Sequence, residues 1–197
     1  MLTAPIDPGA ELASAVAEYR DGNDVGRLLE RVRAVAAACA VDALIAAAEP
    51  FRELPEVAGP IYERVVASRP DDARALVILA NAYWLSGRGP DVVGELASRA
   101  IAADPANRGA WHLWALSESV LRERVARWVQ VAERFPEDEL ARANLADNAA
   151  SLASTEGDRA ALQIALRTYR ALLHTARHPD QRAALEQAIG TLERWRL

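Results

Sequence analysis

Two histidines one helical turn apart are the first residues whose spacing could do chemistry. His174 and His178 are separated by three residues in the segment His-Thr-Ala-Arg-His. Metal sites use this spacing on one face of a helix, but a site needs further ligands, and only Asp180 lies nearby. Imidazoles near a helix end also interact favourably with the negative pole of the helix dipole. We therefore expect no bound metal and no other cofactor.

The nucleophile and phosphate-binding patterns of enzymes are not present. Cys39 is the only cysteine and lies in the apolar run AVAAACAV, where a cysteine packs as a small hydrophobic group rather than acting as a nucleophile. Gly87, Gly89 and Gly94 lack the spacing and the preceding strand of a dinucleotide-binding loop. We therefore expect that the protein is not an enzyme.

Composition restricts the compartment and the partners. The 197 residues are 51% hydrophobic and carry a net charge of −5, which does not favour binding to nucleic acid. One cysteine cannot form an intrachain disulfide, as is typical of a reducing compartment. We find neither a signal-peptide pattern nor an apolar run of about 18 residues, so the sequence predicts a cytoplasmic protein without a membrane segment.

The elements that would position any site are helices. Apolar residues recur at intervals of three and four, as at Leu76, Leu79, Ala80 and Tyr83, and no segment alternates in the manner of a β-strand. The sequence predicts an all-α fold with about eleven helices, at 9–20, 24–38, 40–49, 55–69, 72–86, 91–103, 107–120, 122–134, 138–154, 158–176 and 180–195. The short connections predict antiparallel neighbours.

Proline followed by an acid or amide marks four of the breaks between these helices. They are Pro70-Asp71-Asp72, Pro105-Ala106-Asn107, Pro136-Glu137-Asp138 and Pro179-Asp180-Gln181. Proline disfavours the α conformation in the residue before it, and Asp or Asn can cap the next helix by accepting its free N–H groups. The first three prolines lie 35 and 31 residues apart, so pairs of helices repeat with a period near 34.

The residues inside these units resemble the tetratricopeptide repeat (TPR) family. Over 73–107 the family pattern of a bulky residue, a leucine with a small residue, and a tyrosine is met at Leu76, Leu79-Ala80 and Tyr83, and Ala100 and Pro105 close the unit. The preceding helix has the family spacing of alanine, aromatic residue and proline. The resemblance implies a right-handed α-solenoid of antiparallel helix pairs, whereas an irregular helical bundle is the alternative.

Later units depart from the pattern. In 108–138 the large residues are tryptophans, Glu118 stands where tyrosine is usual, and the turn is about three residues short. In 139–179 Arg142 replaces the bulky residue. We expect one continuous array, with degenerate helical pairs over 1–54, TPR-like repeats over 55–180 and a C-terminal capping helix over 181–197. The apolar stripe of that last helix is Leu185, Ile189, Leu192 and Trp195.

The resemblance also implies a binding site. In TPR proteins the first helices of successive pairs line a concave groove that holds a segment of a partner. The corresponding residues here are Val77, Asn81 and Trp84, then His112, Leu116 and Ser119, then Ala143 and Asp147. We expect Trp84 to be the main contact, unless it packs against the neighbouring helix. No lysine occurs, so the carboxylate clamp that some family members use on chaperone tails is not expected.

Two functions agree with these features. The first is a non-catalytic protein–protein interaction module, namely an adaptor, scaffold or assembly factor that binds a partner protein or peptide. The second is a regulatory or accessory subunit that tunes an enzyme, or that forms a homo-oligomer through exposed helix faces. Neither involves nucleic acid or a membrane.

Overall fold

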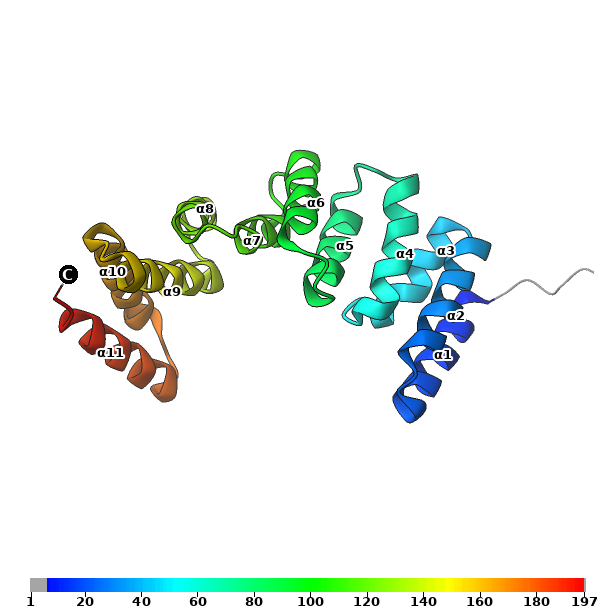
Figure 1. The fold of residues 1–197 in the computed structure, drawn as a ribbon, viewed down its shortest axis with the longest axis horizontal. Helices are drawn as coiled ribbons and strands as arrows, with labels where there is room; N and C mark the ends of the chain where they lie inside the picture. Colours follow the sequence, from blue (N-terminus) through cyan, green and yellow to red (C-terminus); the bar gives the residue numbers. More distant parts are fainter. Residues whose placement is uncertain (1–6, 197) are drawn as a thin grey trace, which may run out of the picture. The chain divides into compact units, whose positions relative to one another are not determined.

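The computed structural model describes residues 7–196, which form eleven α-helices and one short 3-10 helix, with no strand in this part of the chain (Figure 1). The elements are α1 (Pro8–Gly22), α2 (Val25–Ala38), α3 (Val41–Ala48), η1 (Glu49–Phe51), α4 (Pro55–Ser68), α5 (Ala73–Leu85), α6 (Pro90–Ala103), α7 (Arg108–Leu116), α8 (Leu121–Arg134), α9 (Glu139–Glu156), α10 (Arg159–Thr175) and α11 (Pro179–Glu193). The all-α prediction is confirmed. The first six residues, where we expected no leader sequence, lie outside the described residues.

The chain divides into two compact units, with the boundary between Trp114 and Ala115. In the first unit α1 packs on α2 and α3, α4 packs on α2, α3 and α5, and α5 packs on α6. In the second unit α9 packs on α8 and α10, and α11 packs on α10. Each unit is therefore a stack in which a helix contacts mainly its close neighbours along the chain.

Three of the four predicted proline breaks lead into a capped helix. The Asp72 carboxylate accepts from the backbone N of Ala75 at 3.0 Å, and the Asp138 carboxylate accepts from that of Ala141 at 3.2 Å. Asn107 caps α7 in the same way. The fourth break differs, because Pro179 is the first residue of α11 and Asp180 makes no cap there. Proline suits that position because its missing N–H would have no intrahelical partner.

The helix predicted over 107–120 ends earlier than expected. Helix α7 stops at Leu116, and Glu118 lies in the turn, where its carboxylate accepts from the backbone N of Val120 at 2.9 Å. The second helix of this pair starts at Leu121, so the connection is made from residues that the sequence pattern had assigned to the first helix. The predicted helical position of Ser119 is therefore wrong.

Small and large residues alternate in the core, as the repeat pattern predicts. Ala80, Ala97 and Ala100 are fully buried, which lets neighbouring helix axes approach closely. Tyr62 in the first unit and Trp128 in the second are the largest fully buried side chains. Burial of each such side chain contributes about 1.5–3 kcal/mol before the entropy of ordering is subtracted.

The turn between α5 and α6 depends on glycine. Gly87 and Gly89 have φ angles of 70° and 101°, a region that side chains with a Cβ atom rarely adopt. Pro90 then begins α6. The two glycines thus make the reversal that brings α6 back along α5.

The last helix covers α10 with part of the predicted apolar stripe. Ile189 and Leu192 are buried, whereas Leu185 is only half-buried. Trp195 lies beyond the end of α11, is also half-buried, and lines a groove described below. Helix α11 therefore packs on α10 through Ile189 and Leu192, and Trp195 is not one of its buried residues.

Tyr83, the tyrosine of the repeat pattern, ties its helix to the preceding pair. Its hydroxyl donates a hydrogen bond of 2.7 Å to the Glu63 carboxylate on α4, and the Arg88 guanidinium lies 5.0 Å from its ring centroid. Burial, together with the hydrogen bond to Glu63, raises the pKa of Tyr83 to about 12.

Trp128→Ala tests the assignment of the core. Because Trp128 is completely buried on α8, we expect the variant to lose about 3–5 kcal/mol of unfolding free energy. Trp84→Ala is the control: Trp84 is 39% exposed, so the loss there should stay below about 1 kcal/mol. Urea unfolding followed by circular dichroism measures both, and equal losses would contradict the assignment.

Tyr83→Phe tests the link between α4 and α5. An unfolded tyrosine ionises near pH 10, while Tyr83 in the folded chain keeps its proton to about pH 12. Between these values the unfolded state binds fewer protons, so this contribution to stability is present below pH 10 and is lost as the pH rises to about 12. We expect the melting temperature to fall less steeply over this range in Tyr83→Phe than in the parent protein. Identical slopes would exclude Tyr83 as a source of the pH dependence.

Candidate partner-binding site

The face of α5 that was predicted to bind a partner carries two polar groups without partners. Trp84 is 39% exposed, and among residues 7–196 its indole N–H has no hydrogen-bond acceptor. Asn81, one turn earlier, is half-buried, and its side-chain amide likewise has no partner in the described part of the chain. Because 39% exposure leaves the larger part of the side chain covered, packing of Trp84 against the neighbouring helix stays the alternative prediction.

Val77 starts the same face but is engaged in helix packing. It is half-buried against the core of the first unit. A Cβ atom placed on Gly109 of α7 would lie 3.3 Å from the Val77 Cγ1 atom, which is closer than most Cβ contacts. Val77 therefore helps to set the approach of α7 to α5 and leaves Asn81 and Trp84 as the accessible part of the face.

The second predicted set is only partly helical. His112 and Leu116 lie four residues apart on α7, and both are half-buried. Ser119 is exposed in the turn that follows. The boundary between the two units falls within α7, so His112 belongs to the first unit and the other two residues belong to the second.

The third set lies on α9, where Asp147 has a partner within the chain. The Tyr169 hydroxyl of α10 donates a hydrogen bond of 2.5 Å to its Oδ1 atom. Burial and this hydrogen bond raise the pKa of Tyr169, because ionisation would place two negative charges side by side. Ala143, one turn earlier, is half-buried. Asp147 is exposed, so its remaining carboxylate oxygen can still meet a partner.

A groove of about 600 Å³ lies inside the second unit beside this tyrosine, between α9 and α11. Its walls are mostly small or apolar: Ala150, Ser151, Ser154, Thr155, Tyr169, Ala184, Gln187, Ala188, Thr191, Leu192 and Trp195. The hydroxyls of Ser151 and Thr155 donate to backbone carbonyls of their own helix. The groove thus offers a mainly apolar surface with Trp195 on its wall.

Sequence reasoning found one residue near this groove and missed most of the others. Asp147 lies one turn before Ser151 on α9, and the periodic series 147, 151 and 155 could have extended the prediction along the helix. The sequence did not indicate that Trp195 lines the groove, because its spacing assigned it to the buried apolar stripe of the last helix. Its position depends on where α11 ends.

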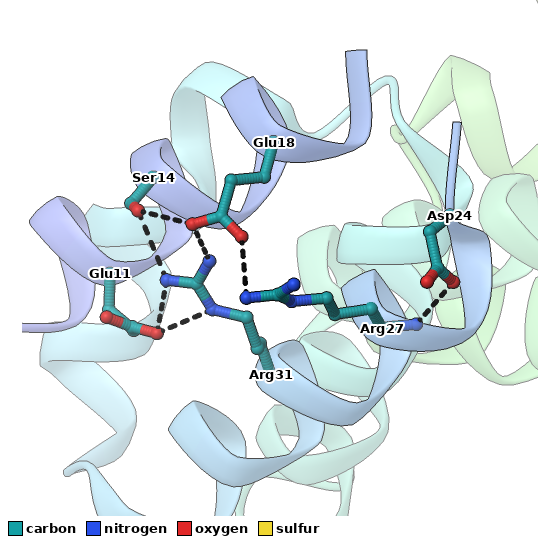
Figure 2. A network of polar contacts seen from close by, with 6 residues as sticks. All are labelled: Glu11, Ser14, Glu18, Asp24, Arg27 and Arg31. Atoms are coloured by element: carbon teal, nitrogen blue, oxygen red, sulfur yellow. Dashed lines mark hydrogen bonds and ion pairs between the residues drawn. The ribbon is translucent and has the colours of Figure 1, made fainter. Parts of the chain in front are cut away.

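A polar network in the first unit is a second candidate. Figure 2 shows Arg31 of α2 between Glu11 and Glu18 of α1. Its Nε atom donates to Glu11 at 2.8 Å and its Nη1 atom donates to Glu18 at 2.6 Å. Arg27 adds an ion pair with Glu18 at 3.2 Å, and Asp24 caps α2 through the backbone N of Arg27.

Arg27 and Arg31 are paired with the carboxylates of Glu11 and Glu18 in this network. The hydrogen bond from Arg31 holds the pKa of Glu18 below its ordinary value, so this carboxylate stays ionised. The hydrogen bond to Glu11 raises the pKa of Arg31. This network joins α1 to α2.

In the described residues, no group of three or more His, Cys, Asp and Glu side chains is placed to hold a metal ion. His174 lies near the end of α10, while His178 follows that helix and precedes α11. The two imidazoles therefore do not share one helix face, contrary to the sequence prediction. Over residues 7–196, no helix has the length and apolar character needed to cross a membrane.

Solved structures with the same fold are known. MamA aligns with a TM-score of 0.58 at 15% identity, covering 88% of this chain and 99% of that one. TTC0263, a thermophilic TPR protein of Thermus thermophilus, aligns with a TM-score of 0.56 at 18% identity, covering 92% and 98%. No protein-family model matches the sequence, and no curated protein does so. At these identities the likeness concerns the fold, and that fold is the TPR-like all-α stack of helix pairs that the sequence resemblance implied.

Proposed function

We propose that this chain is a non-catalytic protein–protein interaction module, an adaptor or assembly factor. It binds a segment of a partner protein on the exposed face of the first helix of each helix pair. The observation that carries the proposal is the accessible pair Asn81 and Trp84 on α5. Tryptophan combines a large apolar surface with one hydrogen-bond donor, and it is enriched among the residues that dominate binding energy. We place this activity in the cytoplasm.

The chemistry of this face indicates the kind of segment that it binds. The Asn81 amide can donate to and accept from a peptide backbone, and the Trp84 indole N–H needs an acceptor. A partner that presents backbone carbonyls beside an aliphatic or aromatic side chain satisfies both residues. Neither Asn81 nor Trp84 carries a charge, so recognition of the segment by these two residues depends on shape and hydrogen bonds.

The groove between α9 and α11 extends the proposal into the second unit. Its volume of about 600 Å³ lies within the range of roughly 300–1,000 Å³ that is usual for ligand sites. Small side chains such as Ala150 and Ser154 on α9 leave room for large side chains of a partner, and Trp195 provides contact area. We propose that it holds an apolar part of a bound segment.

Site-specific photo-cross-linking tests which face binds. A photoreactive residue at position 81 should capture the partner in cells of the native host, whereas one at position 98 on α6 should not. Ser98 is the matched control because it is exposed on the second helix of the same pair. Capture from position 98 alone would contradict the proposal. A cross-link to a second copy of the chain would instead support the self-assembling subunit.

Trp84→Ala should weaken binding of the captured partner by about 2 kcal/mol or more, which is about 30-fold in Kd. The reason is the loss of the exposed indole ring on α5. Val92→Ala on α6 is the control: Val92 is 42% exposed, and the affinity should not change. Calorimetric titration measures binding, while melting curves show that both variants remain folded. Unchanged affinity in Trp84→Ala would remove this face from the site.

Ser154→Tyr should fill the groove between α9 and α11 and weaken binding of the same partner by about tenfold, or 1.4 kcal/mol. Because Ser154 is exposed, the larger side chain should be tolerated by the fold. Gln163→Tyr, an equally exposed position on α10 outside this groove, is the control. If both variants bind as the parent does, the partner does not enter the groove of the second unit.

A further inference from the structure

A second groove of the second unit lies between α8 and α10, over α9. It contains a cavity of about 400 Å³ and another of about 350 Å³, and both are lined by Val129 of α8 and Ile164 of α10. Leu145 and Leu152 of α9 line the first and the second cavity respectively. Both cavities are open to solvent and share these two side chains, so they lie next to each other along α8 and α10.

The two ends of this α8–α10 groove differ in charge. At one end Arg122 donates to Asp158 at 2.7 Å and to Glu156 at 2.5 Å, so its charge is neutralised. At the other end the cavity wall includes Arg142 and Arg167, and neither guanidinium has a carboxylate partner among residues 7–196. The groove therefore combines an apolar middle with one end where two arginines share the wall with a single carboxylate, that of Glu133.

Of the two arginines, Arg142 provides the stronger evidence for a bound anion. It occupies the position of α9 where the repeat pattern has a bulky apolar residue, and it is half-buried. Its Nε atom is shielded from solvent and has no hydrogen-bond partner in the described residues. Because the Nε atom is shielded, an anion in the groove would accept from the Nη groups of this half-buried guanidinium, as in charge-assisted pairs.

The rest of the lining indicates what else the ligand carries. Glu133 of α8 is exposed on the same cavity and pairs with neither arginine. The Thr168 hydroxyl already donates to the backbone carbonyl of Ile164 at 2.9 Å. Apart from the charged side chains at its ends, the described lining of the groove thus offers no free donor. A peptide backbone laid there would lose water without gaining partners, whereas an aliphatic chain carries no such cost.

We propose that the α8–α10 groove binds a linear aliphatic carboxylate, whose carboxylate is held by Arg142 and Arg167 and whose chain lies along Val129 and Ile164. The far end has two carboxylates, Asp158 and Glu156, around the single guanidinium of Arg122, so it disfavours the carboxylate of the ligand and this fixes the orientation. This site is separate from the faces of α5 and α9–α11 to which we assign the partner protein. It adds the binding of a small anion to the proposed function and does not depend on it.

Octanoate is the probe, titrated into the full-length protein by calorimetry and followed by methyl NMR. We expect saturable binding that shifts the methyl signals of Val129 and Ile164. Octan-1-ol, which has no charge, and acetate, which has no chain, should each bind at least about tenfold more weakly than octanoate. Octanoate binding that leaves both methyl signals unchanged would overturn the proposal.

Variants that are expected to change the octanoate affinity in opposite directions separate a ligand contact from a structural effect. Arg142→Met keeps an apolar stem and should weaken octanoate binding about tenfold or more, while the exposed Arg167→Met should weaken it by a smaller factor. Glu133→Gln should strengthen binding about twofold, because it removes a like charge from the cavity wall. Arg170→Met is the matched control, because Arg170 lies on α10 outside the lining of both cavities and donates to Glu193 at 2.7 Å, and it should leave the affinity within about twofold. Equal affinity in Arg142→Met and the parent protein would overturn the proposal.

A peptide is the competing occupant. A blocked tripeptide with glutamate between two leucines presents the same charge and apolar groups on a peptide backbone. We expect it to leave the Val129 and Ile164 methyl signals unchanged at concentrations that saturate with octanoate. Displacement of octanoate by this peptide at equal or lower concentration would show that the groove is a peptide site and would overturn the assignment.

Discussion

A pair of helices cannot bury its own apolar surface, and every other feature of this chain follows from that constraint. Fully buried alanines such as Ala80 and Ala100 let neighbouring helices approach, and large side chains such as Trp128 fill the spaces that remain. The contact between Val77 and the site of Gly109 shows how close the helices come. In the second unit α11 covers part of α10 with Ile189 and Leu192.

The same constraint decides which surfaces remain for ligands. Side chains that face the next helix are buried in the packing between helices. The groups that can bind a ligand therefore lie on helix faces that no neighbouring helix covers. Asn81 and Trp84 occupy such a face on α5, with donors that have no partner in residues 7–196. Arg142 arises differently: it stands where the repeat pattern has an apolar packing residue, and it lines a cavity of the second unit. The first case resembles a protein interface, and the second resembles a small-ligand site.

Local chemistry made the helices predictable, and distant packing made part of the sites unpredictable. Asp72 and Asp138 cap the helices expected after them, since capping depends on adjacent residues. The early end of α7 was missed because no strong breaker precedes Ser119. The departure at Arg142 was visible in the sequence, but its meaning was not, because the groove requires residues from α8 and α10 that only folding brings together. The predicted alignment of the sets on α5, α7 and α9 stays a prediction.

The order of contacts in the first unit has a consequence for its biosynthesis. Helix α2 packs on α1, α3 packs on α1, α4 packs on α2 and α3, and each later helix to α6 packs on the one just before it. Each helix from α2 to α6 can therefore pack, as it is synthesised, on helices that precede it in the chain. Assembly during translation needs no residue from the second unit, and local contacts of this kind form quickly. The nascent chain at any moment exposes only the face of its newest helix, which limits the apolar surface that chaperones must shield.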